Sequence, residues 1–224
     1  MIGTLYGGPL MLPTSVVRVV LAEKSLPFNF VEVPWSPVEG YRPVHPMIAK
    51  YHPDQRNPVW VDDDGAFYDS FLICTYLEDR YDPTSNDRQH AAQRAKSRSL
   101  FFDANRYLFP LIENLVQTRV YGSSSSPADA PRVERGLEVF ARRTKQAKAL
   151  GHYHLDAHHP SLGDLAAATL LNGYAFLAGG LPVACNELVP WLTRMQQRPS
   201  LQSVFNEMQV RVSELMPTFT GSHP

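Results

Sequence analysis

The chain has 224 residues, of which 44% are hydrophobic, and its 21 Lys and Arg against 22 Asp and Glu give a formal net charge of −1. This length is enough for two modest domains or one large one, and the near-neutral charge without a basic run argues against a nucleic-acid or anionic-membrane partner. The two cysteines fit no metal or disulfide spacing, and no apolar run of roughly 20 residues is present. The first residues lack a charged segment followed by a continuous apolar one, so we expect no signal peptide. We therefore expect a soluble, cytoplasmic protein.

The first 82 residues mix strand and helix patterns. Strands are expected at Thr4–Tyr6, which ends at a Gly-Gly-Pro sequence, and at residues 28–33. Between them, the β-branched residues of segment 15–24 would also suit a strand, but the segment continues as Leu-Ala-Glu-Lys and stops at Ser-Leu-Pro, which favours a helix. A strand–helix–strand unit of this length implies a parallel pair with a right-handed crossover.

A turn dipeptide between two short apolar runs predicts a β-hairpin in the next segment. The turn signal is Asp64-Gly65, which tolerates the positive φ angles of a two-residue loop, and residues 59–61 and 66–68 flank it as short strands. A helix at residues 71–81 follows at once. The resulting order of elements, β-α-β and then β-β-α, is thioredoxin-like.

Features at the two ends of this hairpin predict a site for a small anionic peptide. A cis bond at Asn57-Pro58 would turn the N–H and C=O of Asn57 outward, where they could pair with an extended peptide, although trans bonds are far commoner. At the other end, Asp69 and Ser70 stand at a helix N-terminus, which needs side-chain acceptors and can receive an anion. The separation of the two features by one hairpin of fixed length favours a site over two unrelated features.

Beyond residue 82 the patterns are helical. A linker is expected at residues 83–88, a helical domain at 89–224 and a loop at 122–131. The expected helices are 89–121, with a kink at Pro110, 132–150, 161–178, 188–198 and 201–208. Ser161 and Asp164 form a capping box at the start of the most apolar of these helices, which should be the buried centre of this domain.

These features resemble the cytosolic glutathione S-transferases, which have a thioredoxin-like N-terminal α/β domain and an all-α helical-bundle C-terminal domain. The acid–serine pair, the capping box and the closing segment 189–199 carry the resemblance, which spans residues 4–205. It implies a thioredoxin-like domain at residues 1–82, glutathione as co-substrate and a two-fold homodimer. It implies no metal.

The resemblance also assigns the contacts to glutathione. Asp69 and Ser70 would hold the γ-glutamyl carboxylate and amine, with aspartate in place of the more usual glutamate. Asn57, which precedes Pro58, would pair with the cysteinyl backbone, and its polar side chain departs from the apolar residue common there. Arg56 would reach the glycine carboxylate with its two-pronged guanidinium.

The residue that activates the thiol does not match the family pattern. Catalysis needs the thiolate of glutathione, whose thiol pKa of about 8.5 must fall toward neutrality. Met11 occupies the usual serine position and cannot donate a hydrogen bond. Thr14, Ser15 and Tyr6 are the candidate donors, and the amides at the end of the helix are the alternative. The absence of cysteine argues against the branches that form mixed disulfides.

The second substrate is expected to be a hydrophobic electrophile, aromatic or unsaturated, in a pocket formed with Met11, Tyr107 and Phe109. The neighbouring Phe101 and Phe102 also supply aromatic surface, but aromatic residues at helical spacing are often core. The histidines of segment 152–159 lack carboxylate or cysteine partners at ligand spacing, so a solvated loop is expected there and not a metal site.

The function expected from the resemblance is a glutathione-dependent transferase with glutathione bound as the thiolate. Two alternatives remain open. One is a glutathione-binding isomerase or lyase of a specific pathway, and the other is a non-catalytic glutathione-binding interaction module. The fold cannot choose among them.

Overall fold

A computed structural model describes residues 1–82, 91–123, 130–150, 153 and 159–216 of the chain. These residues form two compact units. One unit contains residues 1–82 together with the C-terminal helix α9 (Pro199–Leu215), and the other contains the helices between them. The expected linker at 83–88 lies outside the described residues.

The first unit is built on a four-stranded sheet with the order β2-β1-β3-β4. Its strands are β1 (Thr4–Gly7), β2 (Asn29–Glu32), β3 (Val59–Asp62) and β4 (Gly65–Tyr68). β1 pairs parallel with β2 and antiparallel with β3, and β3 pairs antiparallel with β4. The thioredoxin-like order predicted from the sequence is confirmed.

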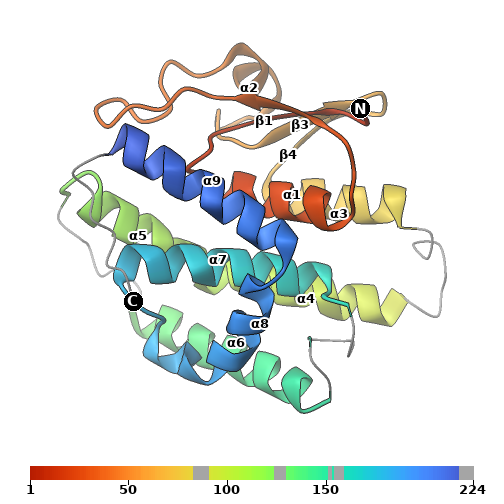
Figure 1. The fold of residues 1–224 in the computed structure, drawn as a ribbon, viewed down its shortest axis with the longest axis vertical. Coiled ribbons are helices and arrows are strands. Elements are labelled where there is room, and N and C mark those ends of the chain that lie inside the picture. Colours follow the sequence, from red (N-terminus) through yellow and green to blue (C-terminus); the bar gives the residue numbers. More distant parts are fainter. Residues whose placement is uncertain (83–90, 124–129, 151–152, 154–158, 217–224) are drawn as a thin grey trace. The chain divides into compact units, whose positions relative to one another are not determined.

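Helices cover both faces of this sheet. Figure 1 shows α1 (Leu12–Glu23) and α3 (Ser70–Tyr81) on one face and α2 (Pro46–Tyr51) on the other. Side chains along each strand alternate between these two faces. The paired Leu5 and Trp60 are buried on one face, while Tyr6 and Val59 lie on the face that α2 covers. Each side of the sheet therefore has its own core.

The sequence analysis did not predict α2. Its start is marked by Pro46 and by His45, whose Nδ1 accepts a hydrogen bond from the N–H of Met47 at 3.2 Å. Proline fits the first helical position because its φ is preset and its missing N–H would have no helical partner.

The same rule explains why α1 begins at Leu12, ahead of the expected start at residue 15. Pro13 lies in its first turn, and the preceding Met11 is the extended N-cap residue, with φ −87° and ψ 115° and no side-chain cap. Thr14 and Ser15 consequently lie within the first turns of the helix, where both are buried.

The hairpin turn differs by one position from the Asp64-Gly65 signal. The loop residues are Asp63 and Asp64, and Gly65 is already paired with Asp62 at the start of β4. A side-chain contact accounts for the shift, since Asp62 Oδ1 accepts a hydrogen bond from the N–H of Asp64 at 3.0 Å and closes the turn from its first residue.

The sequence pattern groups α9 with the helices of the second half, but in the structure α9 packs along α1. Figure 1 shows the two helices side by side. Polar contacts hold α9 on the first unit, and they join Arg18 to Glu207, Arg211 to Glu32 and Ser200 to Glu23. The pattern could not predict this packing because it carries no information on which helices are neighbours in space.

The second unit is helical. It contains α4 (Ala91–Tyr107), α5 (Phe109–Arg119), α6 (Ala130–Leu150), α7 (Leu162–Ala178), the 3₁₀ helix η2 (Val183–Leu188) and α8 (Val189–Gln196). The expected interruption near Pro110 is the break between α4 and α5 at Leu108. α7 contacts α4, α5 and α8 and is the buried centre of this unit, as its apolar sequence predicted.

Asp164 connects α7 to α8. Its side chain is fully buried; Oδ2 accepts hydrogen bonds from the N–H of Ser161 at 2.9 Å and from Ser161 Oγ at 2.6 Å. Its other oxygen accepts from the indole Nε1 of Trp191 on α8 at 3.0 Å. The capping box predicted from the sequence is therefore present, and it also holds a neighbouring helix.

We predict that Asp164→Ala lowers the free energy of unfolding by about 2–4 kcal/mol, because it leaves the buried Trp191 indole and the helix start without their acceptor. Ser161→Ala, which removes only the cap, should lower it by about 1 kcal/mol. The matched control is Ser99→Ala on the exposed surface of α4, expected within about 0.5 kcal/mol of the wild type. Urea denaturation measures all three, and equal losses for Asp164→Ala and Ser99→Ala would contradict the assignment.

Candidate functional site

The side chain of Asn57 joins two segments that are far apart in the sequence. The Asn57-Pro58 peptide bond is cis, and Asn57 itself is only 9% exposed. Its Oδ1 accepts hydrogen bonds from the N–H of Gly8 and from Thr14 Oγ1, each at 3.1 Å. The loop between β1 and α1 is thereby held against the segment that enters β3.

The start of α3 has an unusual backbone. Asp69 is its N-cap residue, with φ 68° and ψ 130°, a region that non-glycine residues rarely occupy. Its Oδ1 accepts a hydrogen bond from the N–H of Phe71 at 2.8 Å, and the next residue, Ser70, is buried. Strained residues of this kind cluster at functional sites, and a helix N-terminus favours an anion.

Two residues beside Asp69 were not singled out by the sequence analysis. The ring of His52 lies 4.8 Å from the ring of Tyr68, measured between centroids. Burial lowers the pKa of His52 below its ordinary value, while the charges of Asp54 and Asp69 act in the opposite direction. His52 follows the last residue of α2. Because the sequence analysis did not predict this helix, it could not place His52 near Asp69.

The candidate thiol-activating residues have different surroundings. The hydroxyl of Thr14 is buried and donates to Asn57. Ser15 is 1% exposed, and its Oγ has no hydrogen-bond partner among the residues that the structure describes. Tyr6 lies on the sheet face under α2, with its ring centroid 5.1 Å from that of His45. Met11 is half-buried at the start of α1.

The aromatic residues expected around the second substrate do not share one environment. Phe101 is fully buried in the core of the second unit, whereas Phe102 is 52% exposed. Tyr107 lines a cavity of about 330 Å³ between α4 and α6. Phe109 lies half-buried at the start of α5 and is not among the lining residues.

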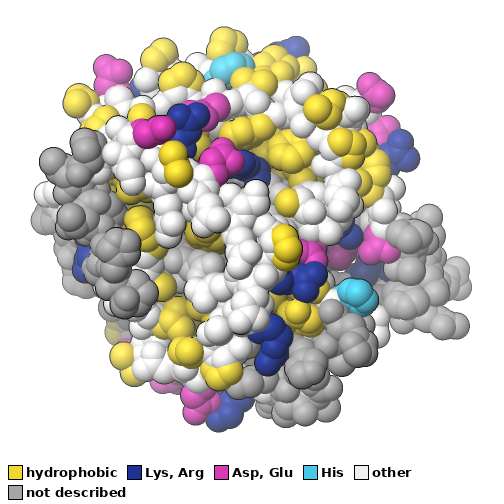
Figure 2. Space-filling model, viewed as in Figure 1, with side chains coloured by type: hydrophobic (Ala, Val, Ile, Leu, Met, Phe, Trp, Pro, Cys, Tyr) yellow, Lys and Arg dark blue, Asp and Glu magenta, His cyan; other side chains and the backbone are white. Residues whose placement is uncertain are grey.

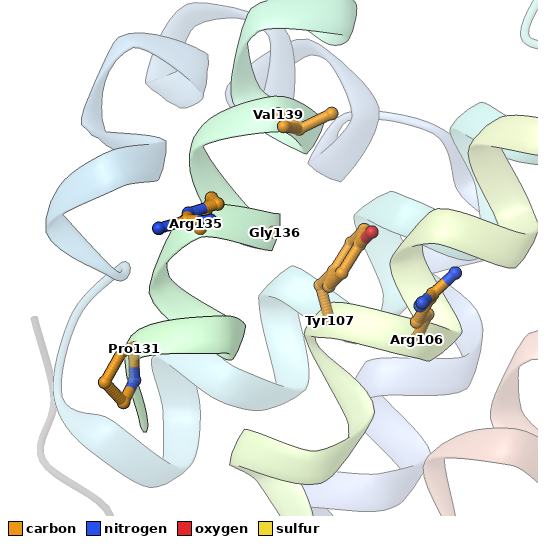
Figure 3. Close-up of a pocket in the computed structure, with 6 residues that line it drawn as sticks. All are labelled: Arg106, Tyr107, Pro131, Arg135, Gly136 and Val139. Atoms are coloured by element: carbon orange, nitrogen blue, oxygen red, sulfur yellow. The ribbon is translucent and has the colours of Figure 1, made fainter. Parts of the chain in front are cut away.

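α4 and α6 approach each other closely beside this cavity. Its lining residues are Arg106, Tyr107, Pro131, Arg135, Gly136 and Val139. In Figure 3 the ring of Tyr107 points from α4 toward α6, where Gly136 faces it. A Cβ atom at Gly136 would lie 2.0 Å from the tyrosine ring, so only glycine permits this approach.

Charged groups are mixed on the molecular surface. On the face shown in Figure 2, Lys and Arg side chains are interspersed with Asp and Glu and with hydrophobic side chains. Within the described part of the chain, no three His, Cys, Asp or Glu side chains gather as metal ligands, and no helix is long and apolar enough to cross a membrane. Of the histidines in segment 152–159, only His159 is among the described residues.

Comparisons with known proteins agree with this fold. The family model described as the glutathione S-transferase N-terminal domain matches residues 5–85. The solved glutathione transferase URE2P8 from Phanerochaete chrysosporium, with oxidized glutathione, is similar with a TM-score of 0.75 at 16% identity, covering 95% of this chain and 97% of that chain.

Two further structures extend the comparison. Glutathione transferase F2 from Populus trichocarpa has a TM-score of 0.73 at 19% identity, over 93% of this chain and 99% of that one. A glutathione S-transferase from Rhodospirillum rubrum has a TM-score of 0.67 at 24% identity, over 90% and 91%. At these identities the structural likeness shows the fold.

We predict that both cysteines are inert in the native protein. Cys74 and Cys185 are fully buried free thiols; burial raises the pKa of Cys74 well above its ordinary value and that of Cys185 to about 12. Since only the thiolate is a nucleophile, Ellman's reagent at neutral pH should label neither residue in the folded state and both after unfolding in guanidinium. Fast labelling of the native protein would contradict this and would make a protein thiol a candidate reactant.

Proposed function

We propose that this chain, which belongs to the glutathione S-transferase family through its N-terminal domain at residues 5–85, is a glutathione-dependent transferase. In this proposal it binds glutathione as the thiolate and transfers it to a hydrophobic electrophile, aromatic or unsaturated. We place it in the cytoplasm, where its two free, buried thiols suit a reducing environment.

The observation that carries the proposal is the strained start of α3. The γ-glutamyl amine would pair with the carboxylate of Asp69, and the γ-glutamyl carboxylate would lie against Ser70 and the first-turn amides of the helix. The cysteinyl backbone would pair with Asn57 beside the cis-Pro58, and exposed Arg56 would reach the glycine carboxylate. One extended tripeptide would thus meet an anion-binding group at each end.

The second substrate would meet apolar side chains. Met11, Tyr107 and Phe109 are partly exposed and have no charge, so each can supply apolar contact surface. The cavity beside Tyr107 also has Arg106 and Arg135 in its lining, which gives it a more polar character than the sequence analysis expected.

One observation favours a second candidate function, a non-catalytic glutathione-binding module. Met11, at the N-cap of α1, has no donor to offer a thiolate, and the hydroxyl of Thr14 is engaged with Asn57. A protein that binds glutathione without lowering the pKa of its thiol would have this function. Titration of the thiolate absorbance of bound glutathione separates the two candidates.

Binding of glutathione at the start of α3 predicts the effect of Ser70→Ala. The variant should bind glutathione about 5- to 150-fold more weakly by calorimetry, because it loses a hydrogen bond to a charged group worth about 1–3 kcal/mol. The matched control is Thr75→Ala, which removes an exposed hydroxyl on the same helix, one that donates to the C=O of Leu72, and should leave affinity unchanged. Equal affinities of the wild type and a folded Ser70→Ala variant would place the site elsewhere.

We also propose that the protein forms a two-fold homodimer. Tyr68 and Leu72, which flank the start of α3, are 37% and 51% exposed and offer apolar surface for an isologous contact. Sedimentation velocity at micromolar concentration should show a particle of twice the 25.2 kDa mass of one chain. Leu72→Arg should shift the distribution toward the monomer, and a wild-type protein that sediments only as the monomer would refute the proposal.

A further inference from the structure

We propose that α2 is a pH-sensitive element, and that protonation of the histidines at its two ends weakens the binding of glutathione. His45 is the N-cap residue of this six-residue helix, and His52 is its C-cap residue. In each of them the ring nitrogen Nδ1 accepts a hydrogen bond from a backbone N–H. The inference rests on the proposed function, because it adds a control by pH to the same site.

The imidazole of His45 caps the N-terminus of α2. Its Nδ1 lies 3.2 Å from the backbone nitrogen of Met47 and accepts that N–H. Pro46 occupies the first helical position and has no N–H, so the amide of Met47 is the first in the helix that needs an acceptor. The ring of Tyr6 on β1 lies beside the imidazole, with the two centroids 5.1 Å apart. A side-chain acceptor at this position stabilises the start of a helix.

His52 holds the turn that connects α2 to the segment entering β3. Its Nδ1 accepts the N–H of Asp54 at 3.1 Å, and its backbone oxygen accepts the N–H of Gln55 at 2.9 Å. Gln55 has a φ of 53°, which few residues other than glycine adopt. Asn57 follows two residues later and would pair with the cysteinyl backbone of glutathione. The turn that His52 closes therefore directs the chain into the candidate site.

Protonation removes both acceptors for the same reason. A neutral imidazole has one N–H and one nitrogen that accepts a hydrogen bond, whereas in the imidazolium ion both nitrogens carry hydrogen and neither accepts. Because each Nδ1 faces a backbone N–H, the neutral rings carry their hydrogen on Nε2, and the added proton must enter at Nδ1. Histidine is the side chain whose charge ordinarily changes between about pH 5 and 8.

The groups around His52 determine the direction of the pH effect. Burial lowers the pKa of His52 below its ordinary value, and the nearby charge of Arg56 acts in the same direction. The charges of Asp54 and Asp69 act in the opposite direction, and Tyr68 on β4 packs against the ring. Because the folded protein binds this proton less readily than the unfolded chain, the order around His52 is complete at neutral pH. It is lost as the pH falls through the lowered pKa.

The packing of α2 connects its ends to the sheet. Ile48 of α2 is 1% exposed and forms a hydrophobic cluster with Val33 and Val59. Val59 is the first residue of β3 and directly follows the cis-Pro58. An isolated helix shorter than about 12 residues is marginal in water, so a six-residue helix depends on this packing and on its caps. Loss of the caps would therefore loosen α2 and the segment entering β3 together.

The first measurement needs no glutathione. The amides of Ala49 and His52 donate to the C=O groups of His45 and Ile48, so their hydrogen exchange reports the opening of α2. Their protection, relative to an unstructured chain at the same pH, should fall about 3- to 30-fold from pH 7.5 to 5.5, the factor that corresponds to the loss of one helix cap. Protection that is constant over this range overturns the inference.

The double variant His45→Asn, His52→Asn provides the matched comparison. Asparagine offers an oxygen acceptor to the same backbone N–H groups and is not protonated in this pH range. The amides of residues 49 and 52 should therefore keep their protection at pH 5.5 in this variant. An equal loss of protection in the wild type and the double variant would show that other groups control α2, and it overturns the inference.

The second measurement is the affinity for S-methylglutathione by calorimetry. The sulfur of this ligand carries no proton, so the titration of a thiol does not contribute. The wild type should bind about 3- to 30-fold more weakly at pH 5.5 than at pH 7.5, and the double variant should bind equally at both. His52→Ala, which lacks the acceptor at every pH, should show the weaker binding already at pH 7.5.

The control His159→Asn removes an exposed histidine from the second unit and should keep the pH dependence of the wild type. A wild-type affinity that is constant between pH 5.5 and 7.5, or that rises in acid, overturns the inference while the proposed function stands. Absence of binding at both pH values overturns the proposed function and its control by pH. The exchange measurement then still decides whether α2 itself responds to pH.

Discussion

The candidate site depends on the two hydrogen bonds that the side-chain oxygen of Asn57 accepts. The donors are the N–H of Gly8 and the hydroxyl of Thr14, which lie 49 and 43 residues away in the sequence. Both hydrogen bonds are buried. Without this oxygen, two buried donors would have no acceptor, and each would lower the free energy of unfolding. The position of the loop before α1 follows from these two hydrogen bonds. So does the position of the Leu10 amide, to which the phenol of Tyr41 is bound.

The parts of the fold that were predicted from the sequence have local signals. The capping box at Ser161, the β3–β4 hairpin and the helix break near Pro110 are each specified within a few residues, and each is present. The contacts around the candidate site are not local. No spacing rule indicates that the Thr14 hydroxyl is engaged by Asn57, or that Tyr41 reaches a loop 31 residues earlier. The sequence therefore indicated which residues lie at the start of α3 and beside Pro58, while the contacts that Asn57 and Thr14 make required coordinates.

The start of α3 keeps a backbone that its residue type disfavours. Asp69 has φ 68°, which glycine would adopt with less strain, but glycine would remove the carboxylate that accepts the N–H of Phe71. The backbone oxygen of Asp69 also accepts the N–H of Ile73 at 2.9 Å, so the strained residue is held from both its side chain and its main chain. A negative charge is thereby fixed where the helix end itself favours anions, an arrangement suited to a ligand that carries an ammonium group beside a carboxylate.

The location of α9 has a consequence for how the chain is made. Along the sequence, the helical unit is inserted between α3 and α9, and both of these belong to the first unit. Residues 1–82 leave the ribosome first, yet the surface of α1 that packs against α9, with the guanidinium of Arg18, lacks its covering helix until the C-terminus is synthesised. A nascent chain halted anywhere before Pro199 would therefore expose that surface. The first unit, although encoded at the beginning of the message, is the last part of the molecule to be completed.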